Sequence, residues 1–135
     1  MIEQLVLLSG PISSGKSTLA DGLTHQFNMS IFKTRQVLHE KVREDLSDNR
    51  KALQAAGERL DKSTRGTWLR DALTKWIKDN PGFSTVIVDS VRTLSQIETI
   101  REAFGPRVIH VHLTAPENDL RKRYERRLKS EQKNI

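Results

Sequence analysis

The chain has 135 residues, no cysteine and a formal net charge of +6 at pH 7. This length suits a single domain with its own hydrophobic core, and the lack of cysteine excludes disulfides and thiolate metal sites, which fits a reducing, cytoplasmic environment. No apolar run approaches the ~20 residues that span a bilayer, no signal peptide precedes Leu5, and the positive charge suits nucleotides or, as a second choice, nucleic acid.

The first predicted elements are a buried strand at residues 5–9 and a helix that begins near Lys16. The segment between them has the pattern G-x-x-x-x-G-K-S of a P-loop. In such a loop, backbone N–H groups surround phosphate oxygens, Lys16 contacts the β- and γ-phosphates, and the Ser17 hydroxyl takes one position on Mg²⁺. A Gly/Ser turn without function is the alternative, but a strand before and a helix after the loop favour phosphate binding. The residues predicted to bind ATP here are Gly10, Ser13, Ser14, Gly15, Lys16, Ser17 and Thr18.

The remaining elements alternate between helices and strands. A short strand at 30–33 is followed by three predicted helices at 34–45, 50–62 and 66–79, and then by an apolar strand at 85–89. A helix at about 94–103, a strand at 107–113 and a basic helix from about Glu117 complete the order. This order predicts one domain, residues 1–135, folded as a three-layer α/β/α P-loop NTPase sandwich with a parallel sheet. Trp68 and Trp76 are expected in the core, with base stacking as the alternative for Trp68.

Two polar residues follow the apolar strand at 85–89. Asp89 ends this strand, where a Walker B carboxylate would hold Mg²⁺ together with Ser17; a helix-capping role is the alternative. Arg92 follows at the carboxyl end of the sheet, where open α/β folds bind ligands, and an arginine there can clamp a phosphate. A surface ion pair is the alternative for Arg92.

The segment VDSVRTLSQ at 88–96 resembles the adenylate-kinase signature, in which an aspartate at the strand end precedes a phosphate-binding arginine and T-L-x-Q. It is one residue shorter between Asp89 and Arg92, and Ser90 stands where glycine is usual. KTRQVLHE at 33–40 is similar to the segment that follows strand two in the same family, with His39 at the place of an acceptor-binding arginine. This resemblance implies acceptor-binding roles for Thr34, Arg92 and Gln96.

A further resemblance lies in the basic helix. LRKRYERR at 120–127 is similar to the start of the family's lid helix, which implies that Arg123 and Arg127 cover ATP and, with Lys16 and Arg92, act in catalysis. LQAAGERL, together with VDSVR, is also similar to dephospho-coenzyme-A-kinase-like proteins. We therefore identify the chain as resembling the P-loop nucleoside monophosphate kinases. The alternative for the basic helix is a solvated face or a nucleic-acid patch.

The end of strand two bears on the acceptor. A hydroxyl acceptor benefits from a carboxylate that takes its proton, whereas an ionised phosphate needs only positioning. Lys33 and Arg35 occur here and no acid does, which favours Mg²⁺-dependent transfer from ATP to a nucleoside monophosphate or nucleotide-like acceptor. The alternatives are a kinase of a hydroxyl on dephospho-coenzyme A, a small metabolite or a nucleic-acid 5′ end, with Asp89, Glu40 or Glu58 as base, and a nucleotide-binding regulatory module of a larger protein.

The resemblance implies a five-stranded sheet of order 2-3-1-4-5, whereas this sequence supplies four strands. We therefore expect that the family's last strand is absent, and that the chain is either cut from a longer protein within the basic helix or completed beside residues 107–113 by another domain or chain. His110 and His112 share one face of that strand, but no third metal ligand accompanies them.

Overall fold

The computed structural model describes residues 2–11, 13–42 and 49–133. Its elements, in chain order, are β1 (Gln4–Ser9), α1 (Lys16–Gln26), β2 (Ser30–Lys33), α2 (Thr34–Lys41), α3 (Arg50–Thr64), α4 (Thr67–Asp79), β3 (Thr85–Asp89), α5 (Leu94–Phe104), the short 3₁₀ helix η2 (Gly105–Arg107), β4 (Val108–His112) and α6 (Glu117–Lys133). The predicted elements are confirmed, with one correction. The helix predicted at 34–45 ends at Lys41, because Val42 is extended (φ −105°, ψ 161°), and positions 43–45 lie outside the described residues.

The four strands form a parallel sheet in the order β2-β3-β1-β4. This order agrees with the prediction, and β4 pairs with β1 alone among the strands of the described part. The pairing aligns Leu8 of β1 with Asp89 of β3. The loop that follows β1 and the segment that follows β3 therefore leave the sheet side by side, at its carboxyl edge.

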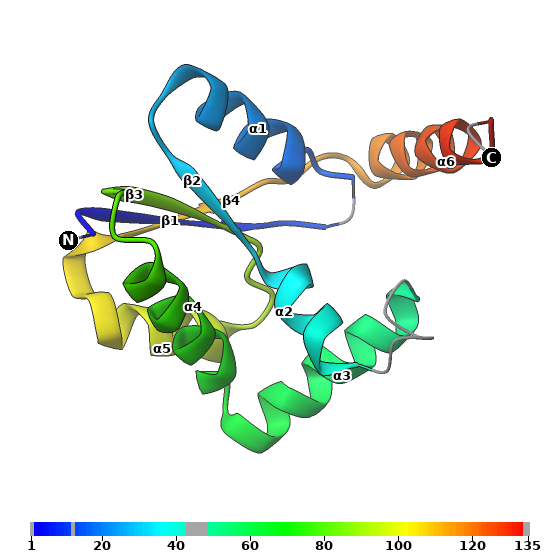
Figure 1. Ribbon diagram of the computed structural model, residues 1–135. Coiled ribbons are helices and arrows are strands. Elements are labelled where there is room, and N and C mark those ends of the chain that lie inside the picture. The colour runs from blue at the N-terminus through cyan, green and yellow to red at the C-terminus, as the bar shows by residue number, and fades with distance from the viewer. Residues whose placement is uncertain (1, 12, 43–48, 134–135) are drawn as a thin grey trace.

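Helices cover both faces of the sheet, which gives the three layers that were predicted. In Figure 1, α1 lies on one face, and α4 and α5 lie on the other. Alternate residues of β1 serve the two faces. Leu5 and Leu7 belong to the large core that includes Leu69 and Leu73 of α4, whereas Leu8 packs with Ala20 of α1. All six of these side chains are fully buried.

The remaining helices lie at the carboxyl edge of the sheet. Figure 1 shows α2 and α3 projecting from the end of β2, and α6 leaving β4 on the same side.

Trp68 at the start of α4 is buried, and its Nε1 donates a hydrogen bond to Asp61 Oδ1 at 2.7 Å, so the core prediction for Trp68 is confirmed. Trp76 is half-buried and packs edge-on against Phe32, with ring centroids 5.9 Å apart.

The two histidines of β4 share one partner. Ser9 Oγ lies 2.6 Å from His110 Nε2 and 2.7 Å from His112 Nδ1. Among the described residues no three His, Asp or Glu side chains gather in a way that would hold a metal ion. A search of the same residues for a helix with the length and apolar character to cross a membrane finds none.

Candidate active site

The loop between β1 and α1 is shaped by its glycines. Gly10 has φ +146°, and a Cβ added there would lie 2.5 Å from the Leu113 carbonyl oxygen, so a side chain would collide with the segment after β4. Gly15, the N-cap of α1, has φ +103°, and Ser13 between them has φ 66°. These left-handed residues curl the backbone so that α1 begins at Lys16 without a side-chain cap. The first N–H groups of α1 and the positive end of its dipole are left for an anion.

Two serine hydroxyls of the loop lack an internal partner. Ser13 Oγ and Ser14 Oγ are buried and make no hydrogen bond to any of the described residues. Buried hydroxyls normally have a hydrogen-bond partner, so each is a donor for a ligand oxygen. All the loop residues that the sequence predicts to bind ATP, from Gly10 to Thr18, line the same cleft. Their contact with ATP remains a prediction.

Lys16 lies over its own loop. Its Nζ donates hydrogen bonds to the carbonyl oxygens of Gly10 at 2.6 Å and Pro11 at 3.0 Å. Burial lowers the pKa of Lys16 below its ordinary value, and the Asp89 carboxylate opposes this shift. The nearby guanidinium groups of Arg127, Arg50 and Arg92 lower the pKa further. A bound polyphosphate would raise the pKa of Lys16 again, because its negative charge favours the ammonium form.

Ser17 and Asp89 form the candidate metal site. Ser17 Oγ donates a long hydrogen bond of 3.4 Å to Asp89 Oδ2. Hard oxygen donors of this kind suit Mg²⁺, which usually keeps several waters and takes only one or two protein ligands beside substrate phosphates. The residues therefore fit the ion. The predicted pair is brought together; its metal binding stays a prediction.

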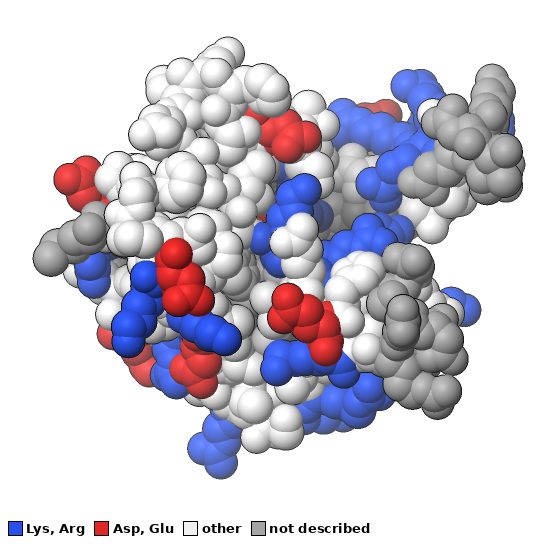
Figure 2. All heavy atoms as spheres, in the orientation of Figure 1, with Lys and Arg blue, Asp and Glu red and all other residues white. Residues whose placement is uncertain are grey.

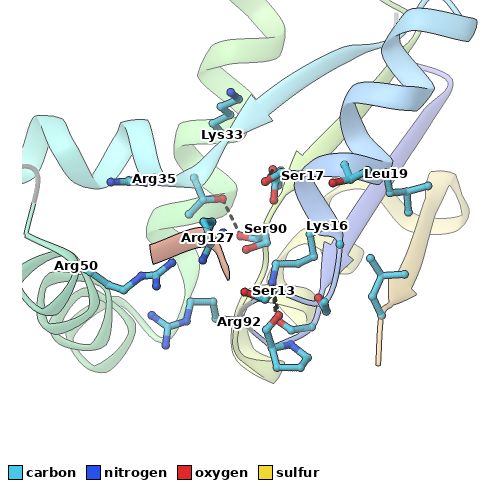
Figure 3. A pocket seen from close by; sticks show the side chains of 18 of the residues that line it. Ser13, Lys16, Ser17, Leu19, Lys33, Arg35, Arg50, Ser90, Arg92 and Arg127 are labelled. Atoms are coloured by element: carbon cyan, nitrogen blue, oxygen red, sulfur yellow. Dashed lines mark hydrogen bonds between the residues drawn. The ribbon is translucent and has the colours of Figure 1, made fainter. Parts of the chain in front are cut away.

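Each residue from Asp89 to Arg92 is fixed by a different part of the fold. Asp89 accepts from Ser17, and the Ser90 carbonyl accepts from Thr34 Oγ1 at 2.8 Å. The Val91 N–H donates to the Leu8 carbonyl at 2.8 Å, and the Arg92 N–H donates to Gln96 Oε1 at 2.8 Å. Figure 3 shows Ser90 beside Ser13 and Lys16 of the P-loop, with the Arg92 side chain directed toward Arg50. These hydrogen bonds hold the backbone of the segment in place, and the exposed Arg92 side chain projects from it.

Thr34 and Gln96, both predicted acceptor contacts, are more deeply placed than Arg92. Thr34 is 6% exposed and its hydroxyl donates to the Ser90 carbonyl, whereas Gln96 is 2% exposed. Both line a smaller cavity of about 140 Å³ that adjoins the main cleft and shares Thr34 and Arg92 with it. Their roles toward an acceptor remain predictions.

The main cleft has a volume of about 1240 Å³ and is strongly basic. Figure 2 shows Lys and Arg side chains gathered where α6 faces the region of α2 and α3. Among the described residues that line the cleft, Asp89 is the one carboxylate. The cations that line it are Lys16, Lys33, Arg35, Arg50, Arg92, Arg123 and Arg127.

Arg50 lines the cleft and was not predicted from the sequence. It is the first residue of α3, the first turn of which contains no acidic residue, and its side chain extends into the cleft toward that of Arg92 (Figure 3). A cation is unfavourable at a helix N-terminus because the helix dipole is positive there. That local conflict is the feature of the sequence that could have marked Arg50 as a candidate for ligand binding.

The two arginines predicted on α6 face the cleft. Arg123 Nη1 donates a long hydrogen bond of 3.4 Å to the Ser13 carbonyl of the P-loop. The Arg127 guanidinium lies 5.7 Å from the centre of the Tyr124 ring, and that of Arg50 lies 5.8 Å from the same centre. Tyr124 therefore connects α6 with α3 through its cation–π contact with Arg50, while the contact with Arg127 lies within α6.

Comparisons with known proteins agree with this architecture. The family model described as "AAA domain" matches residues 6–135. The crystal structure of a sugar kinase from Janibacter sp. HTCC2649, without ligand, superposes with a TM-score of 0.62 at 25% sequence identity. The match covers 90% of this chain but 66% of that one, so this chain spans slightly less than two thirds of the solved structure. A search of curated protein sequences finds no match.

Proposed function

The chain belongs to this AAA domain family, and from the geometry of its cleft we propose that it is a P-loop kinase that phosphorylates an acceptor already carrying a phosphate. The observation that carries the proposal is the imbalance of charge in the cleft, which seven cations and one carboxylate line among the described residues. A nucleoside monophosphate or nucleotide-like molecule fits that balance. The family and the P-loop support ATP as the donor.

The donor side of the cleft is the P-loop together with α6. Loop N–H groups and Lys16 would bind the β- and γ-phosphates, and Arg123 and Arg127 would cover them. Ser17 and Asp89 would hold Mg²⁺, which when bound neutralises phosphate charge and orients the polyphosphate. In this arrangement Lys16 exchanges its two carbonyl acceptors in the loop for phosphate oxygens.

The acceptor side is lined by Lys33, Arg35, Arg50 and Arg92. These cations would bind the acceptor phosphate and hold one of its oxygens in line with the γ-phosphorus. A bond forms between that oxygen and the γ-phosphorus, while the bond from the γ-phosphorus to the β–γ bridging oxygen breaks and ADP leaves. An ionised phosphate needs no general base, so positioning and charge neutralisation are what this site has to supply.

A hydroxyl acceptor is the second candidate, and the similarity to the sugar kinase structure favours it. It requires a base near the acceptor. Asp89 lies beside Ser17, in the candidate metal site, whereas Glu58 lines the smaller cavity next to Arg92. A hydroxyl bound between Arg92 and Glu58 would thus have a carboxylate within the same cavity.

The test is an ADP-release assay with ATP, Mg²⁺ and single acceptors. Nucleoside monophosphates are compared with sugars, sugar acids, dephospho-coenzyme A and 5′-hydroxyl oligonucleotides, and Lys16→Ala controls for contaminating kinases. We expect turnover with a monophosphate whose product gains one phosphate by mass. Turnover confined to unphosphorylated sugars would establish the second candidate, and ATP binding without turnover on any acceptor would favour a regulatory module.

A further inference from the structure

A buried chain of hydrogen bonds ends at the backbone of Arg92. The Arg92 N–H donates to Gln96 Oε1 at 2.8 Å, and Gln96 Nε2 donates to Asp61 Oδ1 at 3.0 Å. Trp68 Nε1 donates to the same Asp61 oxygen at 2.7 Å. Gln96 is 2% exposed and Trp68 is 6% exposed, so water competes little for these contacts. The chain connects α3, α4 and α5 with the segment that follows β3.

The chemistry of the three side chains gives this chain a direction. An ionised carboxylate only accepts hydrogen bonds, so Asp61 attracts the amide nitrogen of Gln96 and repels its oxygen. The Gln96 oxygen is thereby turned toward the Arg92 N–H. Without the carboxylate, the Arg92 N–H would still favour this orientation, but the Gln96 nitrogen would lose its acceptor and the amide would be held less firmly. Trp68 supplies a second donor to Asp61 and fixes the carboxylate in place.

The backbone around this chain is tightly packed. Gly66, between α3 and α4, has φ +82°, and a Cβ there would lie 2.7 Å from the Ser95 carbonyl carbon and 2.8 Å from the Gln96 nitrogen. Thr99 Oγ1 donates to the Gly66 carbonyl at 3.2 Å. The α3–α4 corner and the first turn of α5 are therefore in direct contact, and Asp61 and Gln96 have little freedom to separate.

We propose that Asp61 is a positioning residue, which acts through the amide of Gln96 to hold Arg92 beside the smaller cavity, where the acceptor would bind. Asp61, Gln96 and Arg92 all line the cavity of about 140 Å³. The chain of contacts therefore forms the wall of that cavity while it fixes the arginine. What Arg92 is positioned for rests on the proposed function; that its backbone depends on Asp61 does not.

The first test uses a charge exchange between Asp61 and Gln96. Asp61 Oδ1 accepts from both Gln96 and Trp68, so Asp61→Leu removes both contacts, whereas in Gln96→Glu two carboxylates meet. The double variant Asp61→Asn/Gln96→Glu restores one donor to one acceptor, and it still offers an oxygen to the Arg92 N–H. We expect each single variant to lower kcat/KM for the acceptor by about tenfold with little change in the KM for ATP, and the double variant to recover most of it. A double variant worse than both singles would overturn the proposal.

The second test is independent of activity. Amide hydrogen exchange at Arg92, followed by NMR, should accelerate about tenfold or more in Asp61→Leu and return toward the wild-type rate in the double variant. Asp71→Leu on the exposed side of α4 is the matched control and should leave that rate unchanged. An Arg92 amide that exchanges at the wild-type rate in folded Asp61→Leu would refute the role of Asp61. If no acceptor is ever phosphorylated but this exchange behaves as expected, the proposed function fails and the positioning role stands.

Discussion

Ser17 Oγ and Asp89 Oδ2 lie 3.4 Å apart, although 72 positions separate the two residues in the chain. The parallel pairing of β1 with β3 produces this contact, because Leu8 and Asp89 are partners in register. Two oxygens on adjacent positions of an octahedral Mg²⁺ lie about 3 Å apart, since each is about 2.1 Å from the ion. The strand pairing, together with the loop that starts α1, thus sets nearly the spacing that Mg²⁺ would require.

Asp89→Asn and Ser17→Ala should therefore weaken the use of Mg²⁺. We expect transfer to fall by ~10²-fold or more in Asp89→Asn, and the Mg²⁺ concentration for half-maximal rate to rise in both variants. The measurement is a magnesium titration at saturating ATP. Asp21→Asn, on the exposed side of α1, is the control and should behave as wild type. Unchanged magnesium dependence in both site variants would show that the metal is held elsewhere.

Lys16→Ala should abolish transfer with a loss of ~10²-fold or more, because it removes a charge-assisted contact to the transferred group. Burial lowers the pKa of Lys16, and bound phosphate raises it, so ATP binding takes up a proton at alkaline pH. ATP affinity should then fall as the pH rises through the lowered pKa. Calorimetry in buffers of different ionisation enthalpy measures the proton uptake. Its persistence in folded Lys16→Ala would assign it to another group.

Arg92→Ala and Arg50→Ala should damage the acceptor side. Each removes one guanidinium from the wall opposite the P-loop, so we expect the acceptor KM to rise by ~10-fold or more and kcat to fall, with ATP binding nearly unchanged. Arg59→Ala, an exposed residue on the same helix as Arg50, is the matched control. Separate titrations of ATP and acceptor decide the matter. A defect confined to ATP would place both arginines on the donor side.

The sequence predicted the strands and the P-loop because both depend on local patterns, whereas the order of the strands followed from the family resemblance. Buried strands are continuous apolar runs, and the P-loop is a contiguous motif whose glycines occupy left-handed positions such as Gly15. Asp89 and Arg92 followed from the same logic, since each lies directly after a recognisable strand. The parallel pairing of β1 with β3 is enough to bring Asp89 and Arg92 to the same edge of the sheet as the P-loop.

Other features of the site depend on tertiary contacts that no local pattern encodes. Arg50 enters the cleft because α3 packs beside α2, and residues 43–48 between these helices lie outside the described part. Asp61 belongs to an ordinary helical pattern, and its partner Gln96 is 35 positions away. The end of α2 was also misplaced, because the apolar spacing of Val42 continues the helical pattern although its backbone is extended.

His110 on β4 should make stability depend on pH. Burial, together with the charges of Arg101 and His112, lowers the pKa of His110, so the unfolded chain binds more protons than the folded chain below pH ~6.5. Stability is therefore highest above that pH and falls as the pH drops through the lowered pKa. Thermal melts from pH 8 to 5 should show this trend, and His110→Gln should reduce it. An equal slope in His110→Gln would assign the effect to other groups.

Tyr124 should control how α6 closes over the cleft. The guanidinium groups of Arg50 and Arg127 lie 5.8 and 5.7 Å from the centre of its ring, and exposed cation–π contacts contribute about 0.5–1 kcal/mol each. Tyr124→Ala should lower kcat several-fold by loosening α6, whereas Tyr124→Phe, which keeps the ring, should stay near wild type. Arg127→Ala should have a larger effect than Tyr124→Ala, because it also removes a cation that would contact ATP. Steady-state kinetics with ATP as the varied substrate measures all three variants. If Arg127→Ala altered only the binding of oligonucleotides, measured at several salt concentrations, then α6 would be a nucleic-acid surface and not a lid.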